Sequence, residues 1–334
     1  MGKHEDSAEK VIDAFLERDL TADAAAGRLA PAFQLDDAVS RAIEVLDSGR
    51  HLVVTGDAGV GKTALVHELA RRTHLGRGPT ALAGKRVLQL SLRQRVSMLK
   101  DPDTLRPEMQ KLLHALVEQK SSVVPFFRDF HLAYRFDLES QIQTLAYRLN
   151  APVLGEGPRA TIAALFEGTP ELDSQFVVLP LQEVSLSSML PLLEEWRGHE
   201  EERSGRRFSP DALEEALHLT HRFLPRGTFP RKALDLLDSV LTGSGAKGLI
   251  EGADVRARFT RLHRVPPLLV DPALPLHLDA LEDDFASRVL GQQEAVRVVV
   301  RMMGLIKAGL SDLRRPFGVF LFVGPTGVGK THLA

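Results

Sequence analysis

The chain has 334 residues, of which 44% are hydrophobic and 26% charged, and it contains no cysteine. These fractions are typical of a globular protein with more than one domain, and the lack of cysteine excludes disulfides, thiolate nucleophiles and cysteine-type zinc sites. A formal net charge of -2 provides no basic footprint for nucleic acid. No apolar run reaches the ~20 residues of a membrane span, and the first residues lack a signal-peptide core. We therefore expect a cytoplasmic protein with no nucleic-acid and no membrane partner.

Helices and strands alternate in the first part of the chain, up to Pro180. Apolar residues recur at helical spacing and predict helices over 8–18, 34–47, 64–72, 104–119 and 141–149. Short apolar runs predict strands over 51–55, 85–90, 123–127, 151–154 and 176–179. Strands that alternate with helices indicate an α/β fold with a parallel sheet.

The pattern after Pro180 is helical. Helices are predicted over 187–197, 211–222, 229–241, 277–287 and 292–310. Between the third and fourth of them lie a glycine- and serine-rich stretch and a proline-rich stretch, which are typical of a linker. A last strand is predicted over 319–323.

One phosphate-binding motif, G-x-x-x-x-G-K-[ST], occurs twice, each time between a predicted strand and the start of a helix. In such a loop the backbone N–H groups and the positive end of the helix dipole bind a polyphosphate. The lysine reaches the β- and γ-phosphates, and the threonine hydroxyl ligates Mg²⁺. Both loops are therefore predicted to bind ATP, with Mg²⁺ held through the nucleotide by Thr63 and Thr331. The predicted nucleotide-binding residues are Gly56, Asp57, Ala58, Gly59, Val60, Gly61, Lys62 and Thr63, and Gly324, Pro325, Thr326, Gly327, Val328, Gly329, Lys330 and Thr331.

The order of these features resembles the Clp family of AAA+ ATPases, which are ring-forming unfoldases and disaggregases. Residues 18–31 resemble the entry segment of the family. Residues 230–238 resemble the lid segment usually written PDKAIDLID, and residues 288–296 resemble the VVGQDEAV segment of the second ring. Residues 315–318, ahead of the second loop, are also similar to the family.

The resemblance implies a P-loop NTPase fold of the AAA+ type with a helical lid, followed by the start of a second AAA+ module. The implied domains are a large α/β domain at 1–184, a lid at 185–241, a linker at 242–275 and a truncated second module at 276–334. The chain is accordingly interpreted as a fragment. In the full-length parent, the resemblance implies a homo-oligomeric ring that hydrolyses ATP and acts on polypeptide substrates.

The first module departs from the family at its second nucleotide motif, usually FIDELH. In one alignment Arg128 replaces the aspartate that orients Mg²⁺-bound water, and Asp129 replaces the glutamate that activates the attacking water. In the other, Asp129 is the metal residue and Phe130 leaves no base. A cation beside the metal opposes Mg²⁺, and aspartate is one methylene shorter than glutamate. Asp129 is thus the one candidate catalytic residue, with an ordinary strand-end carboxylate as the alternative, and hydrolysis is expected to be impaired.

Three further family positions are altered. The tandem arginines of the family correspond to Ser174 and Gln175, and the loss of an arginine finger removes ~10³–10⁵ in rate. The residue that senses the γ-phosphate should lie in 155–158, where no threonine or asparagine occurs, and the pore-loop aromatic corresponds to Asp101. We expect a first module that binds ATP and hydrolyses it weakly or not at all. Two alternatives stay open: a nucleotide-dependent scaffold without turnover, and another P-loop signalling ATPase.

Overall fold

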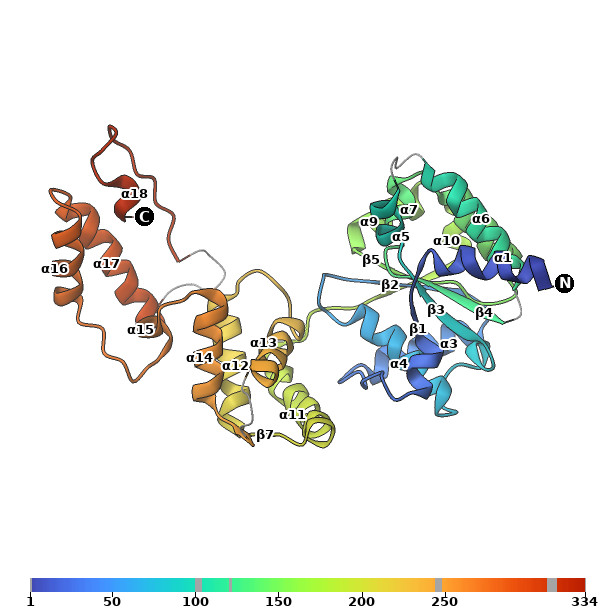
Figure 1. Cartoon of the computed structure of the whole chain (residues 1–334), viewed down its shortest axis with the longest axis horizontal. Helices are drawn as coiled ribbons and strands as arrows, with labels where there is room; N and C mark the ends of the chain where they lie inside the picture. The colour runs from blue at the N-terminus through green and yellow to red at the C-terminus, as the bar shows by residue number, and fades with distance from the viewer. Residues whose placement is uncertain (1, 100–103, 120–121, 244–247, 311–316, 334) are drawn as a thin grey trace. The chain divides into compact units, whose positions relative to one another are not determined.

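The computed structural model describes residues 2–99, 104–119, 122–243, 248–310 and 317–333, with residues 2–7 described by their backbone alone. The chain divides into two compact units, residues 1–184 and residues 185–334. Both units are drawn in Figure 1.

A six-stranded sheet forms the centre of the first unit, in the order β1-β3-β4-β5-β2-β6. All neighbours are parallel except β1, which is antiparallel to β3. Parallel strands that are covered on both faces read as continuous apolar runs, and β2 and β4 are buried at every position. The predicted parallel α/β sheet is confirmed. The strands are β1 (Leu16–Asp19), β2 (His51–Thr55), β3 (Arg86–Leu90), β4 (Val123–Phe127), β5 (Leu154–Gly157) and β6 (Phe176–Pro180).

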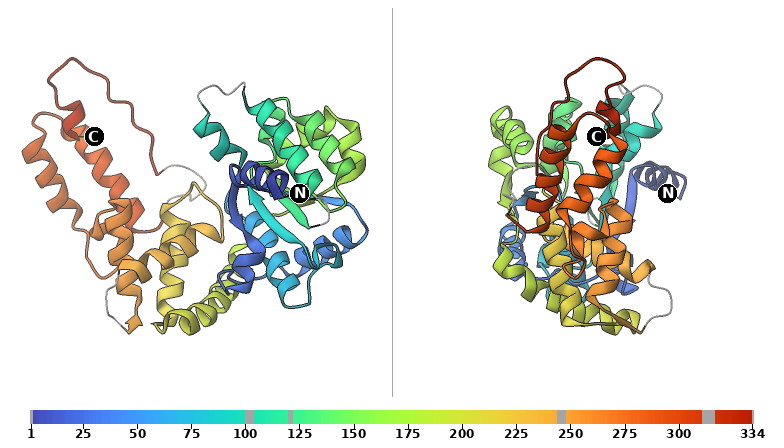
Figure 2. Two further views of the ribbon diagram at one scale, coloured as in Figure 1. Left: turned by 45° about the vertical axis from the view of Figure 1, so that its right-hand side comes forward. Right: turned by 90° about the vertical axis from the view of Figure 1, so that its left-hand side faces the viewer.

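Helices cover both faces of this sheet, with α3 and α4 on one face and α6 on the other (Figures 1 and 2). Their apolar sides and the strands form one continuous core. The helical segments are α1 (Gly2–Asp13), α2 (Leu20–Ala25), α3 (Asp36–Asp47), α4 (Lys62–His74), the 3-10 turn η1 (Thr80–Leu82), α5 (Leu92–Met98), α6 (Leu105–Glu118), α7 (Leu132–Arg135), α8 (Glu139–Arg148), α9 (Arg159–Glu167) and α10 (Pro170–Gln175).

Two predictions for the first unit are wrong in their bounds. The helix expected over 8–18 ends at Asp13, because the next residues pair with β3 as strand β1 and this pairing outweighs the local helical pattern. The strand expected over 151–154 begins only at Leu154. Its two glycines weaken the apolar pattern that would have predicted the strand. The structure requires a glycine at position 155, because a Cβ there would lie 2.6 Å from the ring of Phe130.

The second unit is mainly helical. Helices α11 to α14 pack together, and α16 packs against α17. The sole tryptophan, Trp196 on α11, is buried with its ring 5.1 Å from that of Phe208. The elements are α11 (Leu186–Ser204), β7 (Arg207–Phe208), α12 (Pro210–Phe223), α13 (Arg231–Gly243), β8 (Leu249–Ile250), α14 (Gly252–His263), α15 (Pro267–Val270), α16 (Leu278–Arg288), α17 (Gln293–Lys307) and α18 (Lys330–Leu333).

The passage 242–275, expected to be a linker, contains a further helix of the bundle. Helix α14 packs against α12 and α13, and its Val255 and Phe259 are fully buried. The two side chains are four residues apart, so they share one helix face, and burying that face orders the segment. The expected linker is therefore wrong in its extent.

The strand expected over 319–323 is absent, since no strand pairs with this run in the described part of the chain. Val319, Leu321 and Val323 are 87%, 88% and 83% exposed. A strand needs a neighbour for its backbone N–H and C=O groups, and the described residues of this unit offer none here. Among all the helices described, none has the length and apolar character needed to cross a bilayer.

Candidate functional site

The first glycine loop joins β2 to α4 at the carboxyl end of the sheet. Gly56, Gly59 and Gly61 have φ values of 151°, 98° and 104°, in the left-handed region that favours glycine. A Cβ at Gly56 would lie 2.5 Å from the carbonyl oxygen of Leu181. The glycines thus allow a sharply bent backbone, and a side chain at Gly56 would clash with the neighbouring chain at Leu181.

Two features of this loop fit an anion. Helix α4 begins at Lys62, and no side chain caps its first turn, so the N–H groups of that turn have no helical acceptor. The Lys62 ammonium donates hydrogen bonds to the carbonyl oxygens of Gly56 (2.8 Å) and Asp57 (2.6 Å). Burial lowers the pKa of Lys62. The loop therefore offers a partly desolvated cation and several backbone donors to one polyphosphate.

Thr63, the predicted metal ligand, is hydrogen-bonded to a carboxylate. Its hydroxyl donates to both carboxylate oxygens of Glu156, at 2.9 Å each. Glu156 lies on β5 and is 5% exposed. Burial raises its pKa to about 7, against the opposing effects of the Thr63 hydrogen bond and the charge of Lys62. Residues 155–158 therefore do supply a polar side chain to the site, although no threonine or asparagine.

Comparison with the family motif did not identify Glu156, because the motif has threonine or asparagine at positions 155–158. The available signal was an acidic residue between two glycines, directly after an apolar run.

Arg128 and Asp129, the altered pair, are hydrogen-bonded to residues of β1 and of the start of α5. The Arg128 guanidinium donates to Glu17 on β1 at 2.5 Å, and its Nε lies 3.9 Å from Glu156. Asp129 accepts hydrogen bonds from Ser91 (3.2 Å) and Arg93 (3.3 Å). Arg128 thus lies between Glu17 and Glu156, and its Nε is close to the carboxylate that contacts Thr63, so a cation is near the predicted metal site.

The segment before α3 lies against the loop. A Cβ at Gly61 would meet the Leu35 side chain at 3.3 Å. The backbone N–H of Ala32 donates to the buried carboxylate of Glu68 on α4, at 3.2 Å. Leu35 thus lies next to the glycine loop.

The positions of the missing arginines lie at the end of α10. Ser174 bonds its own helix through Oγ, and its carbonyl oxygen accepts from Arg50 at 3.2 Å. Arg50 also donates to the carbonyl oxygen of Phe176. Asp101, the pore-loop position, lies outside the described residues.

The second glycine loop repeats the first in its local geometry. Gly324, Gly327 and Gly329 have φ values of 159°, 89° and 90°. Lys330 donates to the carbonyl oxygens of Gly324 (2.7 Å) and Pro325 (2.5 Å), as Lys62 does in the first loop. A Cβ at Gly329 would meet the side chain of Val289 at 3.2 Å, which matches the contact of Leu35 with Gly61. Thr331 follows on α18.

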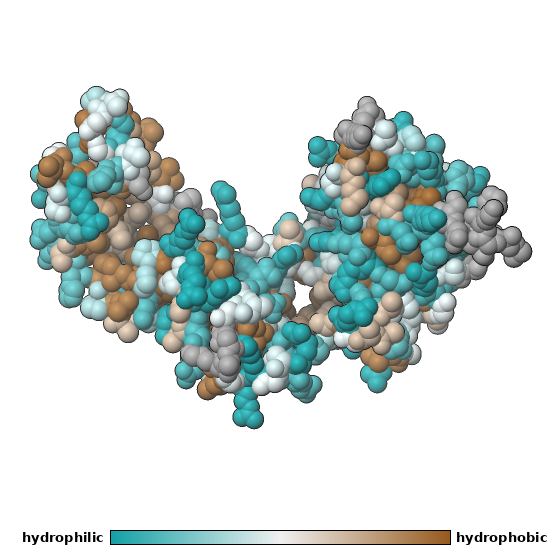
Figure 3. Space-filling view, viewed as in Figure 1, coloured by the Kyte–Doolittle hydropathy of each residue, from teal (hydrophilic) through white to brown (hydrophobic). Residues whose placement is uncertain are grey.

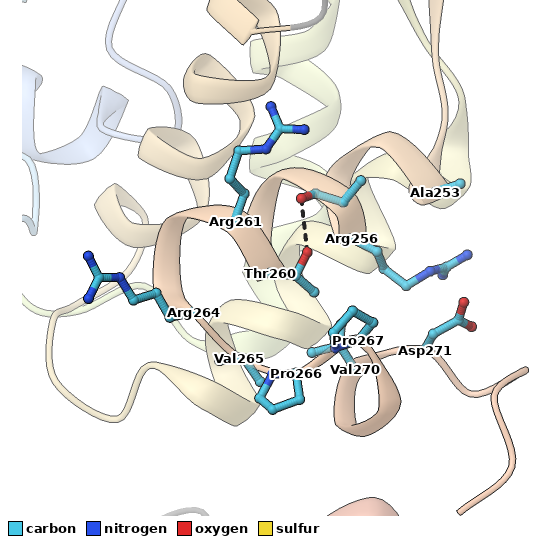
Figure 4. A pocket seen from close by; sticks show the side chains of 11 residues that line it. Ala253, Arg256, Thr260, Arg261, Arg264, Val265, Pro266, Pro267, Val270 and Asp271 are labelled. Carbon is cyan, nitrogen blue, oxygen red and sulfur yellow. Dashed lines mark hydrogen bonds between the residues drawn. The ribbon is translucent and has the colours of Figure 1, made fainter.

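A separate hollow of about 650 Å³ lies in the second unit beside α14 and α15 (Figure 4). Two of its polar groups are engaged: Arg256 pairs with Glu215 at 3.1 Å, and Thr260 donates to the carbonyl oxygen of Ala257. Apolar side chains of Val265, Pro266 and Val270 make up much of its wall. Since it contains no glycine loop, we do not assign it to nucleotide.

No family model matches the chain. Among curated proteins, the "ClpA homolog protein" of Fuscovulum blasticum is 27% identical over 335 residues, covering 95% of this chain and 42% of the relative. The ClpC ATP-binding subunit of the ATP-dependent Clp protease of Staphylococcus saprophyticus is 26% identical over 393 residues, covering 96% of this chain and 48% of the relative. The chain thus spans about half the length of the curated relatives it matches.

Solved structures show the same likeness. Hsp104 of S. cerevisiae in its extended complex with casein has a TM-score of 0.67 and 25% identity, covering 97% of this chain and 57% of that chain. The mixed α/β fold, the two glycine loops and these likenesses agree. Over nearly its whole length the chain is similar to the Clp type of AAA+ ATPases.

Proposed function

We propose that residues 56–63 bind the triphosphate of ATP together with Mg²⁺, and that the chain is the nucleotide-binding part of a Clp-type chaperone. The observation that carries this proposal is the loop itself, with its three left-handed glycines and its desolvated lysine. When bound, Mg²⁺ would neutralise charge on the β- and γ-phosphates. On binding, Lys62 exchanges its two carbonyl acceptors for phosphate oxygens, while the first turn of α4 donates its N–H groups.

Calorimetric titration with ATP tests this proposal. Because the second loop also matches the motif, the first site is isolated in a Lys330→Ala background. Lys62→Ala removes a hydrogen bond to a charged group, which amounts to ~1.5–3 kcal/mol, or about 10- to 150-fold in affinity. Lys111→Ala, at an exposed lysine of α6, is the matched control. Equal affinities for these two variants would contradict the placement of the site.

We propose further that the first site binds ATP more readily than it hydrolyses it. Arg128 is held by Glu17, and Asp129 by Ser91 and Arg93, which supports a site without a free general base. The same contacts favour the second candidate, a scaffold whose bound nucleotide promotes assembly without turnover. Phosphate release measured beside binding separates the two, because tight binding without release supports the scaffold. The double variant Arg128→Asp/Asp129→Glu should raise release, and an unchanged rate would contradict the role given to this pair.

Assembly and substrate are also proposals, because the chain spans only about half of its relatives. We propose a homo-oligomeric ring that acts on polypeptides in the cytosol, supported by the likeness to Hsp104 in complex with casein. Sedimentation of the chain with and without ATP tests the first part. In the Lys330→Ala background, ATP should increase the sedimentation coefficient, and the additional change Lys62→Ala should abolish that increase.

A further inference from the structure

The carboxylate of Glu156 lies where the sheet opens toward the glycine loop. Strand β5 runs parallel to β2, with Glu156 opposite Val54 and Gly157 opposite Thr55. The loop begins at the next residue, Gly56. Ligands of open parallel sheets bind outside the carboxyl ends of the strands, so β5 places this side chain at the ligand edge.

The contact between Glu156 and Thr63 has the spacing of two neighbouring metal ligands. Mg²⁺ demands an octahedron with bonds of about 2.1 Å, so adjacent ligand oxygens lie about 3.0 Å apart. The hydroxyl of Thr63 lies 2.9 Å from each carboxylate oxygen of Glu156. A threonine hydroxyl and one strand-end carboxylate are the two protein groups that hold Mg²⁺ in P-loop NTPases. Their oxygens would need little movement to share one ion.

Strand β4, which was expected to supply the carboxylate for Mg²⁺, does not place one beside Thr63. Strand β4 ends at Phe127 and is followed by Arg128, whose guanidinium is bonded to Glu17. The carboxylate of Asp129 is bonded to Ser91 and Arg93. Glu156, on the adjacent strand and one methylene longer than aspartate, is the acid that contacts Thr63.

The surroundings of Glu156 are those of a buried acid close to the phosphate-binding loop. Glu156 is 5% exposed, and its carboxylate accepts from the Thr63 hydroxyl and lies 3.9 Å from the Nε of Arg128. An ion at this position would therefore be paired with a carboxylate that is shielded from water. Among the described residues, no group of three or more acidic, histidine or cysteine side chains is arranged so that it could hold a metal ion by itself. This suits Mg²⁺, which takes one or two carboxylates and completes its shell with phosphate oxygens and water.

We propose that Glu156 supplies the protein carboxylate to the nucleotide-bound Mg²⁺ of the first site, beside the Thr63 hydroxyl, in place of the acid that Arg128 replaced. This inference rests on the proposed binding of ATP to residues 56–63. It assigns Glu156 a role in metal binding and none in activating water, so a site that lacks a general base retains Mg²⁺-dependent affinity for ATP.

Calorimetric titration with ATP in the Lys330→Ala background tests the inference, once in EDTA and once in Mg²⁺. In the otherwise unmodified chain, Mg²⁺ should tighten binding. Glu156→Gln keeps the shape and an acceptor for Thr63 but removes the charge, so the Mg²⁺ enhancement should fall by about tenfold or more. Glu167→Gln, at an exposed acid of α9, should leave the enhancement unchanged. Binding in EDTA shows whether each variant is folded.

The outcomes are distinguishable. Absence of ATP binding in both EDTA and Mg²⁺ would overturn the proposed function and the inference with it. Binding with an equal Mg²⁺ enhancement in Glu156→Gln would overturn the inference alone, as would tighter binding of MgATP by Glu156→Gln, which would mean that the carboxylate repels the phosphates. If Glu156→Gln does not bind ATP in EDTA, the double variant Glu156→Gln/Arg128→Asp is the deciding test of the inference. It returns an acid to the end of β4 and should restore the Mg²⁺ enhancement, and a failure to do so counts against the inference.

Discussion

Replacing Glu68 should destabilise the first unit more than any change at an exposed acid. Its carboxylate, on α4, is 1% exposed and accepts two hydrogen bonds from Arg71, one from Arg72 and one from the backbone N–H of Ala32. Burial alone would raise the pKa of Glu68, but the hydrogen bonds from Arg71 and Arg72 outweigh burial, so its pKa is lowered. The ion pairs therefore stabilise the fold, and they also hold the segment that lies against the glycine loop.

The expected loss of stability follows from the two arginine charges that Glu68→Gln leaves without a carboxylate partner. Removing one partner of a buried ion pair costs ~3–5 kcal/mol, because the remaining charge has no partner. Arg71 and Arg72 keep 29% and 23% of their side-chain surface in water, so part of their charge can be resolvated. We expect a loss of about 2–3 kcal/mol in the free energy of unfolding, equivalent to a shift of about 1 M in the urea midpoint.

Urea unfolding followed by far-ultraviolet circular dichroism measures this loss. Fluorescence of Trp196, the sole tryptophan, reports the second unit and should keep its midpoint. Glu44→Gln, at an exposed acid of α3, is the control. Because the pKa of Glu68 is lowered in the folded state, its stabilisation is present above its ordinary value of 4.5 and is lost as the pH falls below it. Equal urea midpoints for Glu68→Gln and Glu44→Gln would refute this reasoning.

Three further changes test other parts of the fold. Gly155→Ala would place a Cβ 2.6 Å from a buried phenylalanine ring and should cost about 1–3 kcal/mol in urea unfolding, whereas Gly168→Ala, with no contact under 3.4 Å, should cost far less. Phe259→Ala should cost about 3–5 kcal/mol in the transition followed by tryptophan fluorescence, and a cost no larger than that of exposed Leu262→Ala would mean that α14 is not part of the bundle. Burial lowers the pKa of His51 below its ordinary 6.5, so stability should fall as the pH drops through that value. His51→Gln should flatten this fall in thermal melts between about pH 7 and 5, and an unchanged slope would contradict it.

The glycine loops could be predicted from the sequence because their geometry is encoded within eight neighbouring positions. Each glycine marks a left-handed turn, and the lysine and threonine follow at the start of a helix. Glu156 could not be predicted in the same way. It is 93 residues from Thr63, and the contact depends on the pairing of β5 with β2. Likewise, the partners of Arg128 and Asp129 come from β1 and α5, which alignment to a motif does not reveal.

The same distinction holds for the fold. Strands β2 and β4, buried on both faces, were predictable from continuous apolar runs. Strand β1 was not, because its four residues are ordered by pairing with β3 rather than by their own pattern. Helix α14 carried a signal in Val255 and Phe259, but the glycine- and proline-rich stretches on either side of it obscured that signal.

The unpaired run 319–323 has a practical consequence for handling this chain. Apolar residues gather on the surface of the part that carries α16, α17 and the second glycine loop (Figure 3). Beside them, Val319, Leu321 and Val323 leave an extended β-branched and leucine-rich segment open to other molecules. Such a segment pairs readily with its own copies, so concentrated preparations will self-associate through intermolecular β-structure. A charged residue at position 321 should improve solubility without touching the first nucleotide loop.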